Sequence, residues 1–233
     1  MHFSKKWLKG SIAALLSATL LLGQALPVSA AIMSKQQEEQ LKIAVLSDTH
    51  YLSPDMIKDT TDYTNHLNSD RKMFTESAAI LDKMLETVKE DQPDVLMISG
   101  DLTKDGEKEG HEQLAEKLEH LKEEVPNLKV YVVPGNHDLR NSNAMNFNTE
   151  DGTAIPAGRT EPEDFKQIYS DVTFEDESII DTYTPPEGKE AGGLSYVARP
   201  EDGYTVIAID SARYSADNTD SGLDEHETSG AIS

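Results

Sequence analysis

Three short apolar runs alternate with two amphipathic segments in the first half of the chain. The runs cover residues 41–47, 94–99 and 128–133, and their length and mostly apolar character are typical of buried parallel strands. Between them, residues 71–90 and 107–124 place apolar side chains three and four positions apart, which is the pattern of amphipathic helices. A β-α-β-α-β order predicts a mostly parallel sheet with helices packed on it.

The pattern changes beyond this unit. Residues 140–160 are polar and contain four asparagines, which predicts a loop or cap around the mouth of a site. A short helix is expected at 162–170. Residues 194–199 and 204–210 flank a turn that contains glycine, so they predict a β-hairpin.

The first thirty residues have the three parts of a secretory signal peptide. Lysines within the first ten residues precede an apolar stretch at 12–26, and small residues at 28–30 form a cleavage site. We therefore assign 1–30 as a signal peptide cleaved before Ala31, and expect an exported protein that is extracellular or associated with the cell envelope. The alternative is an uncleaved membrane anchor. The apolar stretch is shorter than the roughly 20 residues that a span needs, so no stable membrane span is expected after cleavage.

Composition restricts the chemistry in two ways. The chain has 43 acidic and 21 basic residues and a net charge of −22, which repels nucleic acid and anionic lipid. Binding to a nucleic-acid duplex is therefore not expected. The sequence has no cysteine, which excludes disulfides, thiolate metal sites and a thiol nucleophile. Any metal must be held by Asp, Asn and His side chains.

Each of the three predicted strands stops at a polar cluster. The clusters are Asp48-Thr49-His50, Gly100-Asp101 and Gly135-Asn136-His137-Asp138. Because the carboxyl ends of strands line the ligand crevice of open α/β sheets, the clusters should converge. Residues two apart in a strand face the same side, so Asp48 and His50 can hold one ion together. Asp101 can bridge two ions through its two carboxylate oxygens.

The ligand types in these clusters indicate a class of metal. Hard oxygen atoms together with imidazole suit Mn, Fe, Zn or similar divalent ions. A pair of such ions about 3.5–4 Å apart can hold the attacking and leaving oxygens of a phosphoryl transfer.

In this order, each after a strand, the clusters resemble the first three motifs of the calcineurin-like metallophosphoesterases. The resemblance spans roughly residues 41–210. It implies an α/β fold, a β-sandwich flanked by helices, in which the βαβαβ start forms one sheet and the later hairpin belongs to the second. It also implies metal-dependent hydrolysis of a small phosphate ester, with two divalent ions (Mn, Fe or Zn) and water activated by them as the nucleophile.

The resemblance further implies a role for each matched residue. Asp48, His50 and Asp101 would hold the first metal. Asp101 and Asn136 would hold the second. His137 would contact the phosphate or protonate the leaving oxygen, and Asp138 would fix the His137 ring.

Within the family, we expect a phosphodiesterase. The export signal, the long loop after His50 and the helix beginning Arg71-Lys72-Met73 are most similar to bacterial exported members of the cyclic-nucleotide phosphodiesterase type. The alternatives are a phosphomonoesterase or nucleotidase of the same fold, a truncated non-catalytic metal-binding fragment, and a binding protein that has kept the fold without the chemistry. A binding protein without the chemistry would be expected to have lost motif residues. However, every ligand expected up to Asn136 is present, and so is His137.

The sequence also departs from the family pattern. That pattern continues with a histidine after a later strand and a Gly-His-x-His segment. In the given sequence, His226 is the only histidine after Asp138. We therefore interpret residues 31–233 as the N-terminal part of a metallophosphoesterase domain, incomplete at its C-terminus and about three metal ligands short of the usual closed coordination.

Other residues of similar type receive no functional role. His66, His111 and His120 are interpreted as solvated or helix-face histidines. Tyr51 and Arg140 neighbour the motifs and can line a substrate pocket, but packing explains them equally well.

Overall fold

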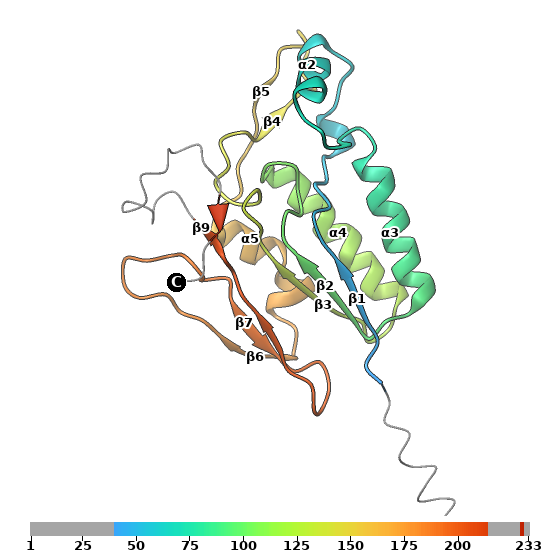
Figure 1. Ribbon diagram of the computed structural model, residues 1–233, viewed down its shortest axis with the longest axis vertical. Coiled ribbons are helices and arrows are strands. Elements are labelled where there is room, and N and C mark those ends of the chain that lie inside the picture. The colour runs from blue at the N-terminus through green and yellow to red at the C-terminus, as the bar shows by residue number, and fades with distance from the viewer. Residues whose placement is uncertain (1–39, 214–228, 231–233) are drawn as a thin grey trace, which may run out of the picture. The chain divides into compact units, whose positions relative to one another are not determined.

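The parallel sheet forms where the apolar runs predict it. The computed structural model describes residues 40–213 and 229–230, and all of these except Gln40 belong to one unit, Leu41–Ser233. Strands β1 (Ile43–Leu46), β2 (Val95–Ser99) and β3 (Lys129–Val133) pair in parallel in the order β1-β2-β3 (Figure 1). The predicted signal peptide, residues 1–30, lies outside the described residues.

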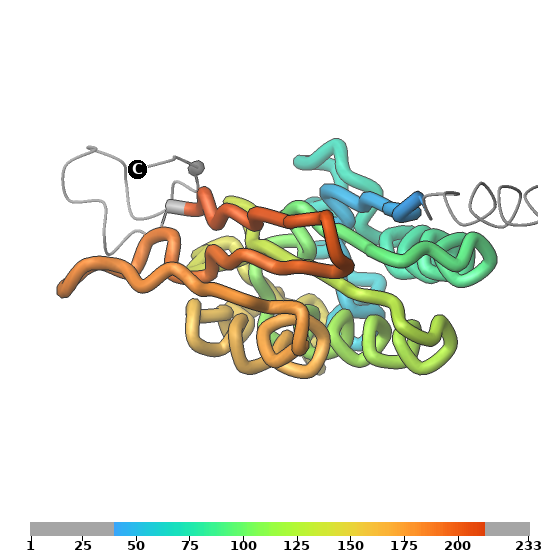
Figure 2. The backbone as a smooth tube through the Cα atoms, turned by 90° about the horizontal axis from the view of Figure 1, so that it is seen from below, coloured from blue at the N-terminus to red at the C-terminus, as the bar shows by residue number. Residues whose placement is uncertain are grey.

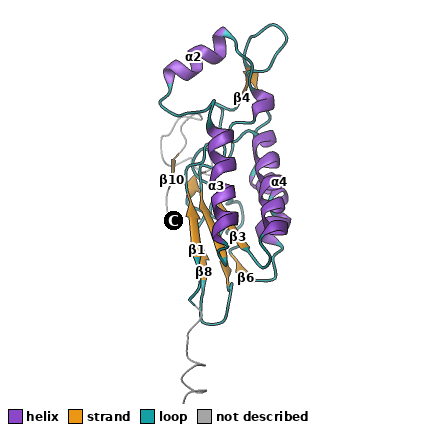
Figure 3. Ribbon diagram, turned by 90° about the vertical axis from the view of Figure 1, so that its right-hand side faces the viewer, coloured by secondary structure: helices purple, strands orange, loops and turns teal. Residues whose placement is uncertain are grey.

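Side chains alternate between the two faces of this sheet, as the period of a strand requires. Leu96 and Ile98 of β2 face a core that is shared with helices α3 (Ser77–Asp91) and α4 (Lys108–Glu124). Figure 3 shows these two helices running along the strands. The alternate residues of β2, Val95 and Met97, face a separate core on the opposite side.

A second sheet covers that opposite side. Strands β6 (Ile179–Thr182), β7 (Tyr196–Ala198) and β8 (Val206–Ala208) form it in the order β6-β7-β8, with both pairs antiparallel. Tyr196 packs from β7 against Val95 and Tyr131, and its hydroxyl donates to the Val132 carbonyl of β3 at 2.9 Å. The orange and red strands lie above the coils of α4 and α5 in Figure 2. The two sheets and the flanking helices confirm the predicted fold class, and β7 and β8 confirm the hairpin.

The remaining elements are short. They are the 3-10 helix η1 (Pro54–Met56), α2 (Thr61–Ser69), β4 (Met145–Asn146), β5 (Ile155–Pro156), α5 (Pro162–Ile168), the π-helix η2 (Ser170–Phe174), β9 (Ala212–Arg213) and β10 (Ser229–Gly230). Strands β4 and β5 pair with each other, as do β9 and β10. Within the described ranges, no helix has both the length and the hydropathy that a membrane crossing requires.

The segment between β1 and α3 differs from the sequence expectation. Helix α2 lies in what was expected to be a long loop, and α3 begins at Ser77, so residues 71–76 are not helical. Helix α2 leaves a weak signal because Tyr63 is its single fully buried residue. The Thr60 side chain caps it by accepting the Tyr63 amide at 3.2 Å. With β4 and β5, α2 lies beyond the carboxyl ends of the parallel strands (Figure 1).

Candidate metal centre

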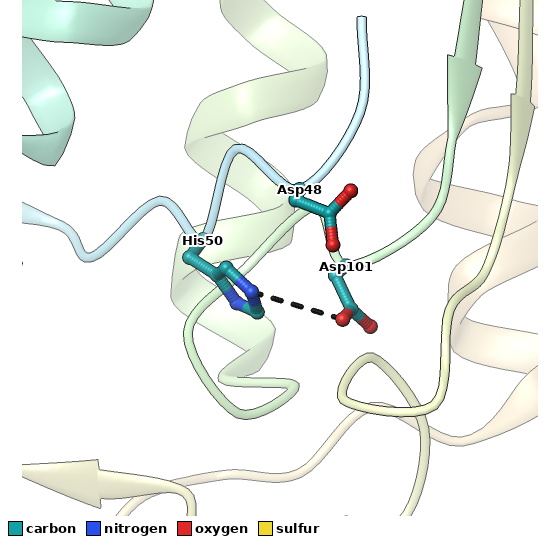
Figure 4. A group of neighbouring side chains, drawn as sticks. All are labelled: Asp48, His50 and Asp101. Carbon is teal, nitrogen blue, oxygen red and sulfur yellow. Dashed lines mark ion pairs between the residues drawn. The ribbon is translucent and has the colours of Figure 1, made fainter. Parts of the chain in front are cut away.

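Three predicted ligands meet at the carboxyl end of the parallel sheet. One ligand atom from each of Asp48, His50 and Asp101 lies within 4.8 Å of the others. The Nε2 atom of His50 is 3.7 Å from Oδ2 of Asp101 (Figure 4). Asp48 and His50 follow β1, and Asp101 follows β2. The predicted convergence of two strand ends is therefore confirmed.

Asp48 and His50 do not come together because residues two apart in a strand face the same side, which was the expectation. Strand β1 ends at Leu46, so neither residue lies in a strand. Asp48, His50 and Asp101 have φ angles of 54°, 40° and 49°, in the left-handed region that residues other than glycine rarely adopt. Such strain persists when the surrounding structure fixes it, and it is concentrated at functional sites. The proximity of Asp48 and His50 was predicted correctly, but the geometric reason given for it was wrong.

Hydrogen bonds between the two ligand loops fix this strained backbone. The amide of Asp48 donates to the Gly100 carbonyl at 3.2 Å, and the amide of His50 donates to the Asp101 carbonyl at 2.9 Å. The next rung runs from the Tyr51 amide to the Leu102 carbonyl, also at 2.9 Å. The pairing of β1 with β2 thus continues past the ends of both strands and holds the ligands of one strand against those of the other.

The third predicted motif packs directly on Asp101. The His137 amide donates to Asp101 Oδ1 at 3.0 Å, so the two oxygens of this carboxylate face different groups. Gly135 allows the contact, because a Cβ there would lie 2.2 Å from Asp101 Oδ1. Asn136 lies between Gly135 and His137 in the chain, and both of these neighbours approach Asp101. Its assignment to a second metal stays a prediction.

Asp138 does not fix the ring of His137, and that expectation is wrong. The Asp138 side chain is fully buried and accepts backbone amides from Leu102, Thr103 and Gly135, at 3.1, 3.0 and 2.7 Å. Burial raises its pKa to about 6. Asp138 therefore joins the loop after β2 to the loop after β3, and acts on the site through the backbone.

Asp105 holds the His137 ring instead. Its Oδ1 lies 2.8 Å from His137 Nδ1 and also accepts the Asn141 side-chain amide at 3.2 Å. Its other oxygen binds the ammonium group of Lys104, which is completely buried. Both oxygens are therefore occupied, which gives the His137 ring a fixed partner. Sequence reasoning missed Asp105 because Lys104-Asp105-Gly106 is typical of an ordinary turn before a helix.

Carboxylates and aromatic rings surround the buried ammonium group of Lys104. Its Nζ is 3.4 Å from Glu107 Oε1, and the rings of Phe74 and Phe147 have centroids 5.5 and 5.8 Å away. Burial raises the pKa of Glu107. The buried ammonium group of Lys104, paired with the carboxylates of Asp105 and Glu107, stabilises the ionised form of Asp105.

The two histidines of the site have opposite electrostatic surroundings. The hydrogen bond to Asp105 raises the pKa of His137, whereas burial and, next, the charge of Lys72 lower the pKa of His50. The rings are 5.1 Å apart and perpendicular. His50 is thus biased toward the neutral form that binds metal, and His137 toward the protonated form that can donate a proton.

The residues present fit a divalent metal ion. His50 Nδ1 is buried and has no hydrogen-bond partner among the described residues, although buried polar atoms are normally paired. Two carboxylates and an imidazole, with no thiolate, are the ligand types that Mn, Fe and Zn accept. The donor set is therefore that of a metal site in which further ligands complete the coordination.

The histidines without an assigned role differ in their surroundings. His111 lies on α4 as a helix-face residue, which is one of the two surroundings expected for it, and it is fully buried. Its Nδ1 pairs with the Tyr169 hydroxyl at 2.9 Å, and burial lowers its pKa to about 3. His66 is half-buried against Phe74, and the side chain of His120 is 70% exposed.

Packing accounts for the two residues that neighbour the motifs. Tyr51 is buried, and its hydroxyl donates to Gln113 at 2.8 Å. Arg140 forms ion pairs with Glu161 and Glu190 at 2.5 Å each. These contacts tie the turn after β3 to the start of α5 and to the loop that precedes β7.

The fold and the site have the features of a metal-dependent hydrolase: a parallel sheet with flanking helices, a second sheet, and an Asp-His cluster at the strand ends. A family model described as calcineurin-like phosphoesterase matches residues 41–225. Since this match covers most of the chain, the protein belongs to the calcineurin-like phosphoesterase family, whose members are metal-dependent phosphoric ester hydrolases. No curated protein matches the chain significantly.

Proposed function

We propose that this protein hydrolyses a phosphodiester at a dinuclear metal site held by Asp48, His50, Asp101 and Asn136, with His137 as the proton donor. The observation that carries the proposal is the meeting of Asp48, His50 and Asp101 within 4.8 Å, beside the turn that contains His137. A bridging role for Asp101 is supported by its two oxygens, one facing His50 and the other the amide of His137.

Two divalent ions, when bound, polarise the phosphoryl oxygens and lower the pKa of a water molecule. Asp101 and His50 hold their positions through the continued backbone pairing of the two ligand loops. His137 directs Nδ1 toward Asp105, which leaves Nε2 to face the substrate. As water attacks phosphorus and the bond to the leaving oxygen breaks, His137 Nε2 gives its proton to that oxygen. Asp105 stabilises the imidazolium before transfer.

We also propose that the protein is exported and acts outside the cytoplasm. The basic, apolar and small-residue parts of residues 1–30 support this. N-terminal sequencing of the secreted product should find Ala31 as the first residue. An intact apolar stretch on a membrane-bound product would contradict it.

The proposed roles separate in two variants of the full chain. Asp101→Asn should lower metal content and turnover of a chromogenic phosphodiester together, because it alters a ligand. His137→Ala should keep most of the metal and reduce the rate by roughly 10²- to 10⁴-fold, as for loss of a positioned acid. His120→Ala, at an exposed helix position, is the matched control and should change neither quantity. Equal metal loss in Asp101→Asn and His137→Ala would show that His137 is assigned wrongly.

A further inference from the structure

Lys72 brings a positive charge into the site from a segment that sequence reasoning placed in a helix. Its Nζ lies 3.4 Å from His137 Nε2. The residue follows α2, and its backbone amide donates to Asp70 Oδ1 at 3.0 Å. Its ammonium group also lies 6.0 Å from the centre of the buried Phe74 ring. Both contacts hold this non-helical segment near His137.

The charge of Lys72 is available to a ligand. Among the described residues, no carboxylate lies within ion-pair distance of its Nζ, and the residue is half-buried. In a chain with a net charge of −22, an ammonium group without a carboxylate partner, next to a cluster of candidate metal ligands, is a candidate for binding an anion.

The ammonium group of Lys72 has donors to spare for a ligand. It carries three N–H donors, and the 3.4 Å contact with His137 Nε2 uses at most one of them. Another can donate to a ligand oxygen that lies about 2.7–3.2 Å from Nζ. The acceptor that gains most from a positively charged donor is an anionic oxygen.

We propose that Lys72 is a substrate-binding residue that, beside His137, holds a non-bridging oxygen of the phosphate group. This inference rests on the proposed function, because it takes the phosphate to lie at the Asp48, His50 and Asp101 cluster. A dianionic phosphate interacts with the ammonium group more strongly than a monoanionic diester does. Lys72 therefore adds affinity for phosphate monoesters and for inorganic phosphate beyond what it adds for diesters.

The test compares three variants of the full chain loaded with Mn²⁺. Lys72→Met removes the charge and keeps much of the length, Lys72→Arg keeps the charge, and Arg71→Met removes an exposed neighbouring charge as the matched control. The measurements are metal content, thermal unfolding, the dissociation constant for inorganic phosphate by calorimetry, and turnover of p-nitrophenyl phosphate and bis(p-nitrophenyl) phosphate.

Lys72→Met should keep its metal and unfolding temperature and weaken phosphate binding by about 10- to 100-fold, as for loss of a charge-assisted hydrogen bond. Its kcat/KM should fall more for the monoester than for the diester. Lys72→Arg should recover part of the affinity, and Arg71→Met should match the wild type. Unchanged phosphate affinity, equal losses on both esters, or loss of metal in Lys72→Met would overturn the assignment. Absence of turnover by a metal-loaded wild type would instead refute the proposed function, while phosphate binding would still test Lys72.

Discussion

Oδ1 of Asp105 lies 2.8 Å from Nδ1 of His137, and this pair sets the orientation and charge of the residue proposed to donate the proton. Burial alone would raise the pKa of Asp105, but its contacts with His137 and the buried Lys104 lower it overall. Asp105 therefore stays ionised next to His137, and this ionised partner favours the imidazolium form.

Replacing Asp105 by Asn tests this relationship. The hydrogen bond to Asp105 raises the pKa of His137, so the neutral amide should let that pKa fall. A proton donor with a lower pKa loses its proton at lower pH, so the alkaline side of the pH profile of kcat/KM should move to lower pH. The rate at neutral pH should fall by about 10- to 100-fold with metal content unchanged. A slower enzyme with an unshifted profile would show that Asp105 acts through stability alone.

Gly135→Ala should disrupt the metal centre. The new Cβ would lie 2.2 Å from Asp101 Oδ1 and 2.3 Å from the Asp101 amide nitrogen, so the turn or the ligand must move. We expect a loss of about 1–3 kcal/mol in the free energy of unfolding and weaker metal binding. Gly158→Ala is the control, because its Cβ would meet nothing closer than 3.9 Å. Denaturant titration and metal analysis measure both effects, and equal behaviour of the two variants would contradict the packing argument.

Asp138→Ala should act on stability. The change leaves the buried amides of Leu102, Thr103 and Gly135 without the carboxylate that they now share. We expect the free energy of unfolding to fall by about 3–5 kcal/mol. Asp82→Ala removes an exposed carboxylate that pairs with Lys117, and should change stability by less than about 1 kcal/mol. Similar chemical denaturation midpoints for the two variants would exclude the proposed role of Asp138.

His111 should make the protein sensitive to acid. Its pKa is about 3 in the folded state against 6.5 in the unfolded state, so the unfolded chain binds an extra proton between these values. The contribution of neutral His111 to the free energy of unfolding is therefore fully present above pH 6.5. It decreases as the pH falls, by up to about 1.4 kcal/mol per pH unit. Asp138, which His111 contacts, has its pKa raised from 3.8 to about 6 and therefore opposes this trend between those values.

The effect of His111 is isolated by comparing the wild type with His111→Asn, which cannot titrate. The variant should be less stable at pH 7, because it loses the fitted contacts of the imidazole ring. Between pH 6 and pH 4, however, its stability should fall less steeply than that of the wild type. Denaturant titrations across this range, with metal removed, measure the two slopes. Parallel slopes would mean that His111 is not buried in its neutral form.

The sequence predicted what depends on hydrophobic periodicity and on the ends of strands. The apolar runs located β2 and β3 because a strand with buried residues on both faces leaves a continuous apolar signal. They also located β1, although this edge strand leaves Ile43 and Val45 exposed. The polar clusters at their ends identified Asp48, His50 and Asp101 for the same topological reason. This part of the candidate site needed no knowledge of loop conformation.

The rest depends on loop geometry, which leaves little trace in sequence. The left-handed backbone at Asp48 and His50 arises from pairing with a distant loop, so local propensity does not indicate it. Asp105 and Lys72 reach His137 from turns whose residue types are ordinary on a surface. Helix α2 buries too few side chains to show an amphipathic stripe.

The backbone hydrogen bonds that join the loop after β1 to the loop after β2 make the backbone of the candidate metal ligands part of the sheet's own hydrogen-bonded framework. Folding therefore orders the backbone of these residues in advance, and binding an ion costs little further backbone entropy. Amide protons of His50 and Tyr51 should exchange with solvent deuterium nearly as slowly as those of β2, with or without chelator. Removing the ion should accordingly leave the loops in place, and an ion that returns should find its ligands already arranged.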